Sequence, residues 1–143
     1  MAGVAIEVVD TPINQFLARL AAHIDDLSPL FADWGEYLIG STQDRMAREL
    51  SPDGQPWAPL SPAYAATKPE DLPILRLTGA MADTLAYNAG PKDFEFGTGR
   101  IYGAAQHFGR PEIHLPARPW LGLTEEDVTE LLLQTRDYVA DTL

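Results

Sequence analysis

Residues 102–122 read YGAAQHFGRPEIHLPARPWLG. The first seven residues predict a short helix, and Gly109 follows at the position where a left-handed residue commonly ends a helix. Residues 113–115 predict a strand, and the two prolines of segment 116–119 stiffen the chain around Arg118. This stretch therefore predicts several short, sharply bent elements joined by restricted backbone.

Helical periodicity surrounds this stretch on both sides. Downstream, Thr124 and Asp127 approximate a capping box that opens the last helix. The buried face predicted for that helix consists of Val128, Leu131, Leu132, Thr135 and Val139. Upstream, Thr11-Pro12 and Ser28-Pro29 each have the chemistry of a helix start. Two helices are therefore expected, over about 12–27 and 28–50, the second with an apolar face of Leu30, Trp34, Leu38 and Met46.

Shorter elements complete the predicted fold. Alternation over residues 4–9 and again over 94–96 predicts two strands, and residues 79–88 predict a helix with Met81 and Leu85 inward. The Pro-rich loop 51–73 carries aromatic residues that are costly to leave in water, so it is expected to lie against a core or a partner, with Asp53-Gly54 as a turn. The fold class is α+β: a long N-terminal helical region and a C-terminal helix packed with a small, mostly antiparallel sheet, in a single domain over residues 1–143.

Charge and composition exclude several classes of protein. The chain has 143 residues, no cysteine and a formal charge of −11. Such a charge repels phosphates, so sequence-specific nucleic-acid binding is not expected. Disulfides and thiolate metal sites are excluded. No apolar run approaches the ~20 residues that cross a bilayer, and residues 1–9 lack the form of a secretory signal. We expect a soluble intracellular protein with no membrane partner.

Catalytic, cofactor and metal sites are not predicted. The three histidines are His23, His107 and His114, and none has the spacing of a zinc motif. No serine has the glycine context that exposes a nucleophile. A small enzyme would need a pocket that joins His107 to distant acids such as Asp83 or Glu95. The prediction is a protein without enzymatic activity and without a cofactor.

Four phrases occur in a fixed order: Pro52 through Trp57, Leu77 through Gly79, Tyr102 through Gly109 and Pro116 through Gly122. This order resembles the phage virion morphogenesis or tail-completion family of Mu-like and P2-like contractile-tailed phages. The resemblance implies a non-enzymatic assembly factor that completes the tail or the head-tail junction, in the host cytoplasm during assembly and then at the virion neck or tail end. The implied partners are further copies of the chain, arranged as a ring, and tail tube or neck proteins.

We expect the stiff segments between the helices to provide the surfaces for such contacts. The interface candidates are Trp57, Leu60, Tyr64, His114, Arg118 and Trp120. For Arg118 a second reading stays open, an internal clamp between the last strand and the last helix. An alternative function is also open: an acidic inhibitor or DNA mimic that binds a basic host protein through its carboxylates.

Overall fold

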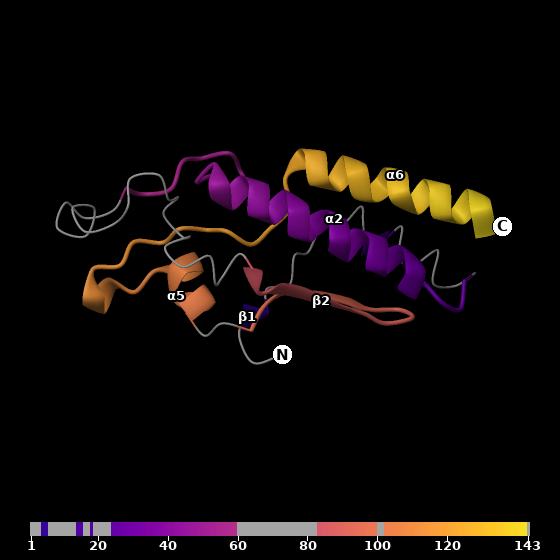
Figure 1. The fold of residues 1–143 in the computed structure, drawn as a ribbon, viewed down its shortest axis with the longest axis horizontal. Coiled ribbons are helices and arrows are strands. Elements are labelled where there is room, and N and C mark those ends of the chain that lie inside the picture. Colours follow the sequence, from indigo (N-terminus) through magenta and orange to yellow (C-terminus); the bar gives the residue numbers. More distant parts are fainter. Residues whose placement is uncertain are drawn as a thin grey trace.

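The computed structural model describes residues 4–5, 14–15, 18, 24–59, 83–99 and 102–142 (Figure 1). Helix α2, Ser28–Ala47, begins where the sequence predicted. Pro29 lies in its first turn, where a missing N–H costs nothing, and Asp26 Oδ1 accepts a hydrogen bond from the Ser28 N–H at 2.9 Å. The predicted apolar face is confirmed, because Leu30, Trp34, Leu38 and Met46 are all buried.

The helix predicted over 12–27 falls mostly outside the described residues. Asn14, Gln15 and Ala18 are helical, and residues 24–27 are not, so the break before Ser28 is confirmed.

Helix α2 ends at Ala47, earlier than the predicted Leu50, because the chain reverses at Glu49, which adopts a φ of 59°. The carbonyl of Glu49 then accepts from the Trp57 N–H at 2.9 Å, and Leu50 pairs with Pro56 in an isolated bridge. These bonds close residues 50–57 into a tight loop that turns at Gly54, which has a φ of 86°. The predicted turn is confirmed, and loop residues 60–73 lie outside the described residues.

A three-stranded antiparallel sheet has the order β1-β3-β2. Its strands are β1 (Val4–Ala5), β2 (Leu85–Ala89) and β3 (Phe94–Thr98). Strands β2 and β3 form a hairpin in which Leu85 faces Thr98 and Ala89 faces Phe94. The strand predicted over 94–96 is confirmed and extends to Thr98. The α+β class is confirmed as well.

The helix predicted over residues 79–88 is wrong in its described part. Asp83 is helical, but Leu85–Ala89 is strand β2. Along β2 the side chains alternate between inward and outward positions, with Leu85 buried and Ala86 exposed. Pairing with β3 and packing under α2 therefore override the helical spacing of Met81 and Leu85.

Helix α5, Tyr102–Phe108, and the left-handed Gly109 after it (φ 75°) are confirmed. The strand predicted over 113–115 is wrong, because Pro111–Ile113 forms the 3-10 helix η1. Pro111 has a fixed φ suited to a helical first turn, and His114 follows it with a φ of 55°. Only an isolated bridge joins Arg110 to Leu115, so this segment is a compact turn that projects at one end of the molecule (Figure 1).

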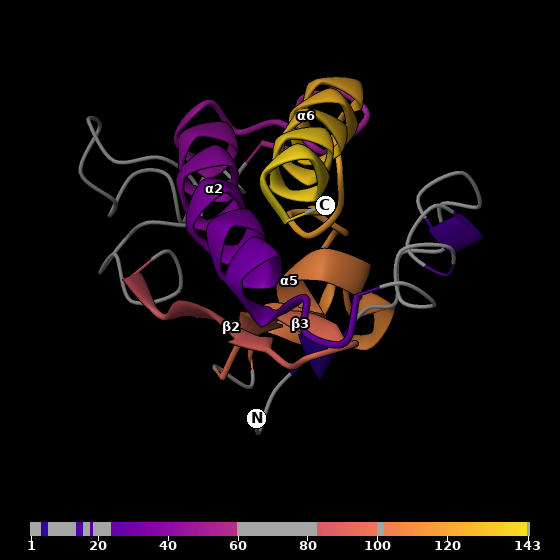
Figure 2. The ribbon, with the colours of Figure 1, turned by 90° about the vertical axis from the view of Figure 1, so that its right-hand side faces the viewer.

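Helix α6, Glu125–Thr142, runs beside α2, and α2 lies over the β2–β3 hairpin (Figure 2). The capping box is confirmed: the Thr124 N–H donates to Asp127 Oδ2, and the Asp127 N–H donates to Thr124 Oγ1, both at 3.0 Å. Leu131 joins a core with Leu27, Leu30, Phe31 and Trp34. The predicted burial of Leu132 is wrong, because it lies 100° around the helix from Leu131 and is 37% exposed.

Candidate functional site

Three of the four sequence phrases meet at the end of the molecule where α2 ends (Figure 1). Two of them, together with one residue each from α2 and β2, form a buried group that we call the tryptophan cluster, which consists of Met46, Trp57, Leu85, Trp120 and Leu121. The third phrase, residues 102–109, meets this cluster through its hydrogen bonds with Trp120. Trp120 is fully buried and Trp57 is 6% exposed. The fourth phrase, residues 77–79, lies outside the described residues.

Trp57 and Arg118 bind two stiff segments to each other through backbone carbonyls. The Trp57 Nε1–H donates to the Pro119 carbonyl at 2.6 Å. In the opposite direction, Arg118 donates from Nε to the Ala58 carbonyl at 2.9 Å and from Nη2 to the Pro59 carbonyl at 3.0 Å. Burial lowers the pKa of Arg118, and the charge of Glu49 opposes that shift. Arg118 is an internal clamp, but it holds the loop after α2 and does not hold the last helix.

His107 accepts hydrogen bonds at its Nδ1 atom. The backbone N–H groups of Trp120 and Leu121 donate to it at 3.3 and 3.4 Å. Burial lowers the pKa of His107, which favours the neutral imidazole that this acceptor role requires. Since His107 already supports the backbone of the tryptophan cluster, it has the structural role that the sequence favoured over catalysis.

Gly109 allows the same segments to approach each other closely. Its φ of 75° is unfavourable for any residue with a side chain. A Cβ atom at this position would also lie 2.7 Å from the Ala117 nitrogen and 2.8 Å from the Leu115 carbonyl oxygen. Gly109 therefore lets the Pro-Ala-Arg-Pro segment return against the end of α5.

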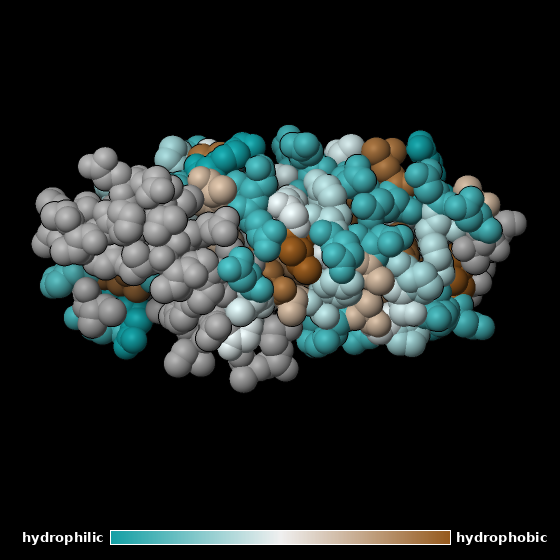
Figure 3. Space-filling view, in the orientation of Figure 1, coloured by the Kyte–Doolittle hydropathy of each residue, from teal (hydrophilic) through white to brown (hydrophobic). Residues whose placement is uncertain are grey.

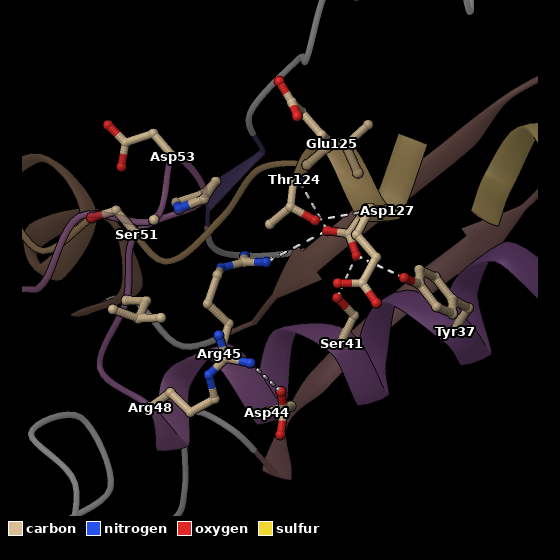
Figure 4. A pocket seen from close by; sticks show the side chains of 15 residues that line it. Tyr37, Ser41, Asp44, Arg45, Arg48, Ser51, Asp53, Thr124, Glu125 and Asp127 are labelled. Atoms are coloured by element: carbon tan, nitrogen blue, oxygen red, sulfur yellow. Dashed lines mark hydrogen bonds and ion pairs between the residues drawn. The ribbon is translucent and has the colours of Figure 1, made fainter. Parts of the chain in front are cut away.

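An open cleft lies between the C-terminal half of α2 and the start of α6 (Figure 4). On its floor Arg45 Nη1 lies 3.6 Å from Asp127 Oδ2, with the two side chains 6% and 2% exposed. Arg45 Nη2 also donates to the Trp120 carbonyl at 2.6 Å. The cleft floor is thus joined directly to the tryptophan cluster.

Asp127 is the centre of the hydrogen bonds in this cleft. Its Oδ1 atom accepts from the Ser41 hydroxyl at 2.5 Å and from the Tyr37 hydroxyl at 3.0 Å, while Oδ2 faces Thr124 and Arg45. Burial raises the pKa of Tyr37 to about 12, with further contributions from the hydrogen bond to Asp127 and from its charge. Burial lowers the pKa of Arg45, and the Asp127 charge opposes that shift. One carboxylate thereby joins α2, α6 and the turn that opens α6.

The cleft contains an internal network of hydrogen bonds and one ion pair, and carboxylates outnumber basic side chains along its lining. The lining carboxylates are Asp44, Asp53, Glu125, Glu126 and Asp127, against Arg45 and Arg48. The Ser41 hydroxyl donates to a carboxylate that is itself paired with a buried guanidinium, so that carboxylate is a poor general base for activating it. Within the described ranges, no group of His, Asp and Glu side chains is arranged to hold a metal ion.

The model of the phage virion morphogenesis family matches residues 8–140. The chain belongs to this family. No curated protein and no solved structure gives a significant match. Membership confirms the resemblance seen in the sequence and gives the chain a role in the assembly of phage particles. None of the described helices combines the length and the apolar character of a membrane span.

In this virion morphogenesis protein, the interface candidates occupy different environments. Trp57, Arg118 and Trp120 are buried and make the internal contacts described above. His114 is exposed on the turn after η1. Leu60 and Tyr64 lie outside the described residues. The described indoles and the Arg118 guanidinium thus hold the subunit together, and His114 is the one described candidate on the surface.

The sequence reasoning missed the buried ion pair between Arg45 and Asp127. Arg45 lies next to Met46 and follows Leu38 by seven residues, so it continues the buried face of α2. That position, a cation in an apolar stripe, was a signal for a buried partner. Asp127 was recognised as a capping residue, but its long-range partners on α2 were not visible from local spacing.

Proposed function

We propose that this protein is a non-enzymatic subunit of a homo-oligomeric ring that completes the phage tail or joins it to the head. The observation that carries the proposal is the family match over residues 8–140. The ring would form in the host cytoplasm and take its place at the neck or tail end of the virion, against tail tube or neck proteins.

The packing of the subunit supports this role. The indoles of Trp57 and Trp120 and the guanidinium of Arg45 make hydrogen bonds that hold α2, α5 and segment 116–122 together. These bonds fix the positions of the remaining surfaces, so less conformational entropy is lost when the subunit associates with a neighbour. The exposed surfaces, and not the buried tryptophans, are then the places where neighbouring molecules bind.

Mass measurement of the purified protein, alone and with isolated tail tubes, tests the proposal. We expect a closed oligomer whose mass is a whole multiple of the 15.7 kDa chain, and retention of that oligomer on tubes. A strict monomer that ignores both tubes and necks contradicts it.

The acidic-inhibitor alternative is favoured by one observation, the run of Glu125, Glu126 and Asp127 at the start of α6, of which the first two are exposed. That function predicts a monomer or dimer that binds a basic host protein with an affinity that falls steeply with added salt. The same mass measurement, repeated over a range of salt concentrations, separates the two functions.

A further inference from the structure

Three large apolar side chains are exposed in the part of the chain that the structure describes, and they lie in two places. Phe108 is 64% exposed at the end of α5, and Leu132 and Leu133 are 37% and 40% exposed on α6. Along the upper edge of Figure 3, over α6, apolar atoms interrupt a hydrophilic surface. The end of α5 and the outer side of α6 face different directions (Figures 1 and 2), so one subunit cannot cover its own Phe108 with its own α6.

Phe108 lies between His107 and Gly109, each of which has a structural role inside the subunit. His107 accepts two backbone N–H groups, and Gly109 allows a close approach of the backbone. The ring of Phe108 makes an edge contact with the His107 ring, at a centroid distance of 4.7 Å, and otherwise faces outward. A large aromatic side chain on a projecting turn is a common anchor of protein interfaces.

The outer face of α6 offers an apolar strip with a charged margin. Thr129, Leu132, Leu133 and Arg136 follow one another at helical spacing on the exposed side. The margin is acidic, because Glu125, Glu126, Asp137 and Asp141 are exposed there and Arg136 is the single base of the helix. Two copies of α6 packed against each other would bring these carboxylates together, which disfavours a symmetric α6 pair.

The turn after α5 has the complementary character. Beside Phe108 it exposes His114 and Arg110, whose side chain is 54% exposed. Arg110 Nε is paired with Glu112 Oε1 at 2.9 Å, and the Glu112 side chain is also exposed, at 60%. A guanidinium has five N–H donors, so Arg110 can bind a second carboxylate while it keeps this pair. An aromatic ring flanked by guanidinium donors fits leucines flanked by carboxylates.

We propose, building on the ring of the previous section, that Phe108 of one subunit binds against Leu132 and Leu133 on α6 of a second copy, with Arg110 at the acidic margin. The contact joins two different patches, so it is heterologous and leaves one patch of each kind free at the ends of every open chain of subunits. Repetition of the contact closes a ring when the rotation between neighbours permits it.

Site-directed cross-linking tests this contact directly, because the chain has no cysteine of its own. Ala117→Cys places an exposed thiol on the segment whose backbone lies against Gly109, and Thr129→Cys places an exposed thiol one turn before Leu133. With a short thiol-specific cross-linker, we expect a covalent dimer when the two variants are mixed and none when either is alone. Asp33→Cys, exposed on α2, is the matched control.

Substitutions of the apolar side chains provide the second test. Phe108→Ser and Leu133→Ser should each weaken self-association by about 30-fold or more, the loss typical of an interface anchor. An equimolar mixture of the two variants retains one intact pair of patches, so it should form a 1:1 dimer that grows no further. Circular dichroism is expected to show an unchanged fold, because both side chains are on the surface.

Several results would overturn the proposed contact. Cross-linking of Thr129→Cys with itself would show a symmetric α6 pair, and a mixture that cross-links no better than Asp33→Cys would place the contact elsewhere. A wild-type oligomer unaffected by Phe108→Ser and Leu133→Ser would refute this interface while leaving the ring intact. A wild-type monomer that ignores tail tubes would instead contradict the proposed function.

Discussion

Replacing Asp127 with asparagine removes the counter-charge of a buried guanidinium with little change of shape. Arg45 is 5% exposed, and its Nη1 atom lies 3.6 Å from Asp127 Oδ2. Coulomb's law at that distance, with an effective permittivity of about 20, gives an attraction of about 4–5 kcal/mol. Removal of one partner from a buried ion pair typically costs about 3–5 kcal/mol, because the other charge stays buried without compensation.

The amide also disturbs the hydrogen bonds. Asp127 accepts from Tyr37, Ser41 and the Thr124 N–H through two oxygens, and an asparagine has only one. At least one donor on the cleft floor therefore loses its acceptor, at a further cost of about 1 kcal/mol. Together these costs lead us to expect that Asp127→Asn lowers the free energy of unfolding by about 4–6 kcal/mol, a large part of the ~5–15 kcal/mol typical of a small protein.

Urea unfolding followed by tryptophan fluorescence measures this loss as a lower transition midpoint at constant slope. Asp137→Asn is the matched control on the same helix: its pair with Arg136 has side chains 71% and 72% exposed, and its loss should cost less than about 1 kcal/mol. Arg45→Met combined with Asp127→Asn should recover part of the stability, because both charges are then absent. Equal losses for Asp127→Asn and Asp137→Asn would refute the reasoning.

Three further predictions concern the tryptophan cluster. Because burial lowers the pKa of His107 below its ordinary value of 6.5, its contribution to stability is present above that pH and is lost as the pH falls towards the folded-state pKa. The free energy of unfolding should be lower at about pH 5 than at about pH 7.5, and His107→Gln should reduce the difference between these two free energies. Gly109→Ala should destabilise by about 2 kcal/mol or more, from the left-handed φ and the overlap with Ala117, in the same urea assay; an unchanged midpoint would contradict the close approach. Trp57→Phe leaves the Pro119 carbonyl without its donor and should cost about 1–3 kcal/mol, with thermal unfolding as the measurement.

Local chemistry in the sequence predicted the elements that depend on neighbouring residues. Ser28-Pro29 opens α2, the box of Thr124 and Asp127 opens α6, and Gly109 ends α5 with the expected φ. Each of these features is set by hydrogen bonds or sterics within a few residues, so the printed sequence is sufficient to find it.

Elements that depend on distant partners were misjudged. Residues 85–89 have helical spacing but pair with β3, and the prediction for residues 113–115 gave too little weight to Pro111 and to the bridge from Arg110 to Leu115. The sequence also did not show that the indoles of Trp57 and Trp120 point into the subunit. Proline and tryptophan show that a segment is rigid and must be covered, but not whether the cover is the same chain or a neighbour.

The same limit applies to the candidate site. The sequence could not show that Arg45 and Asp127 meet across 82 residues, or that Phe108 would stay outside while His107 turned inward. Both outcomes follow from the return of residues 116–122 against α5 and α2, which is a tertiary arrangement. The charge pattern of α6, by contrast, was visible in the sequence and carries directly into the proposed contact.

Electron microscopy of lysates from the encoding phage or prophage, with this gene deleted and then restored, tests most directly whether the chain acts in virion assembly at the tail. The account predicts that the deletion leaves filled heads apart from tails, or tails with incomplete ends, and that the restored gene returns joined, infectious particles. A deletion lysate with normal numbers of intact, infectious particles would contradict it.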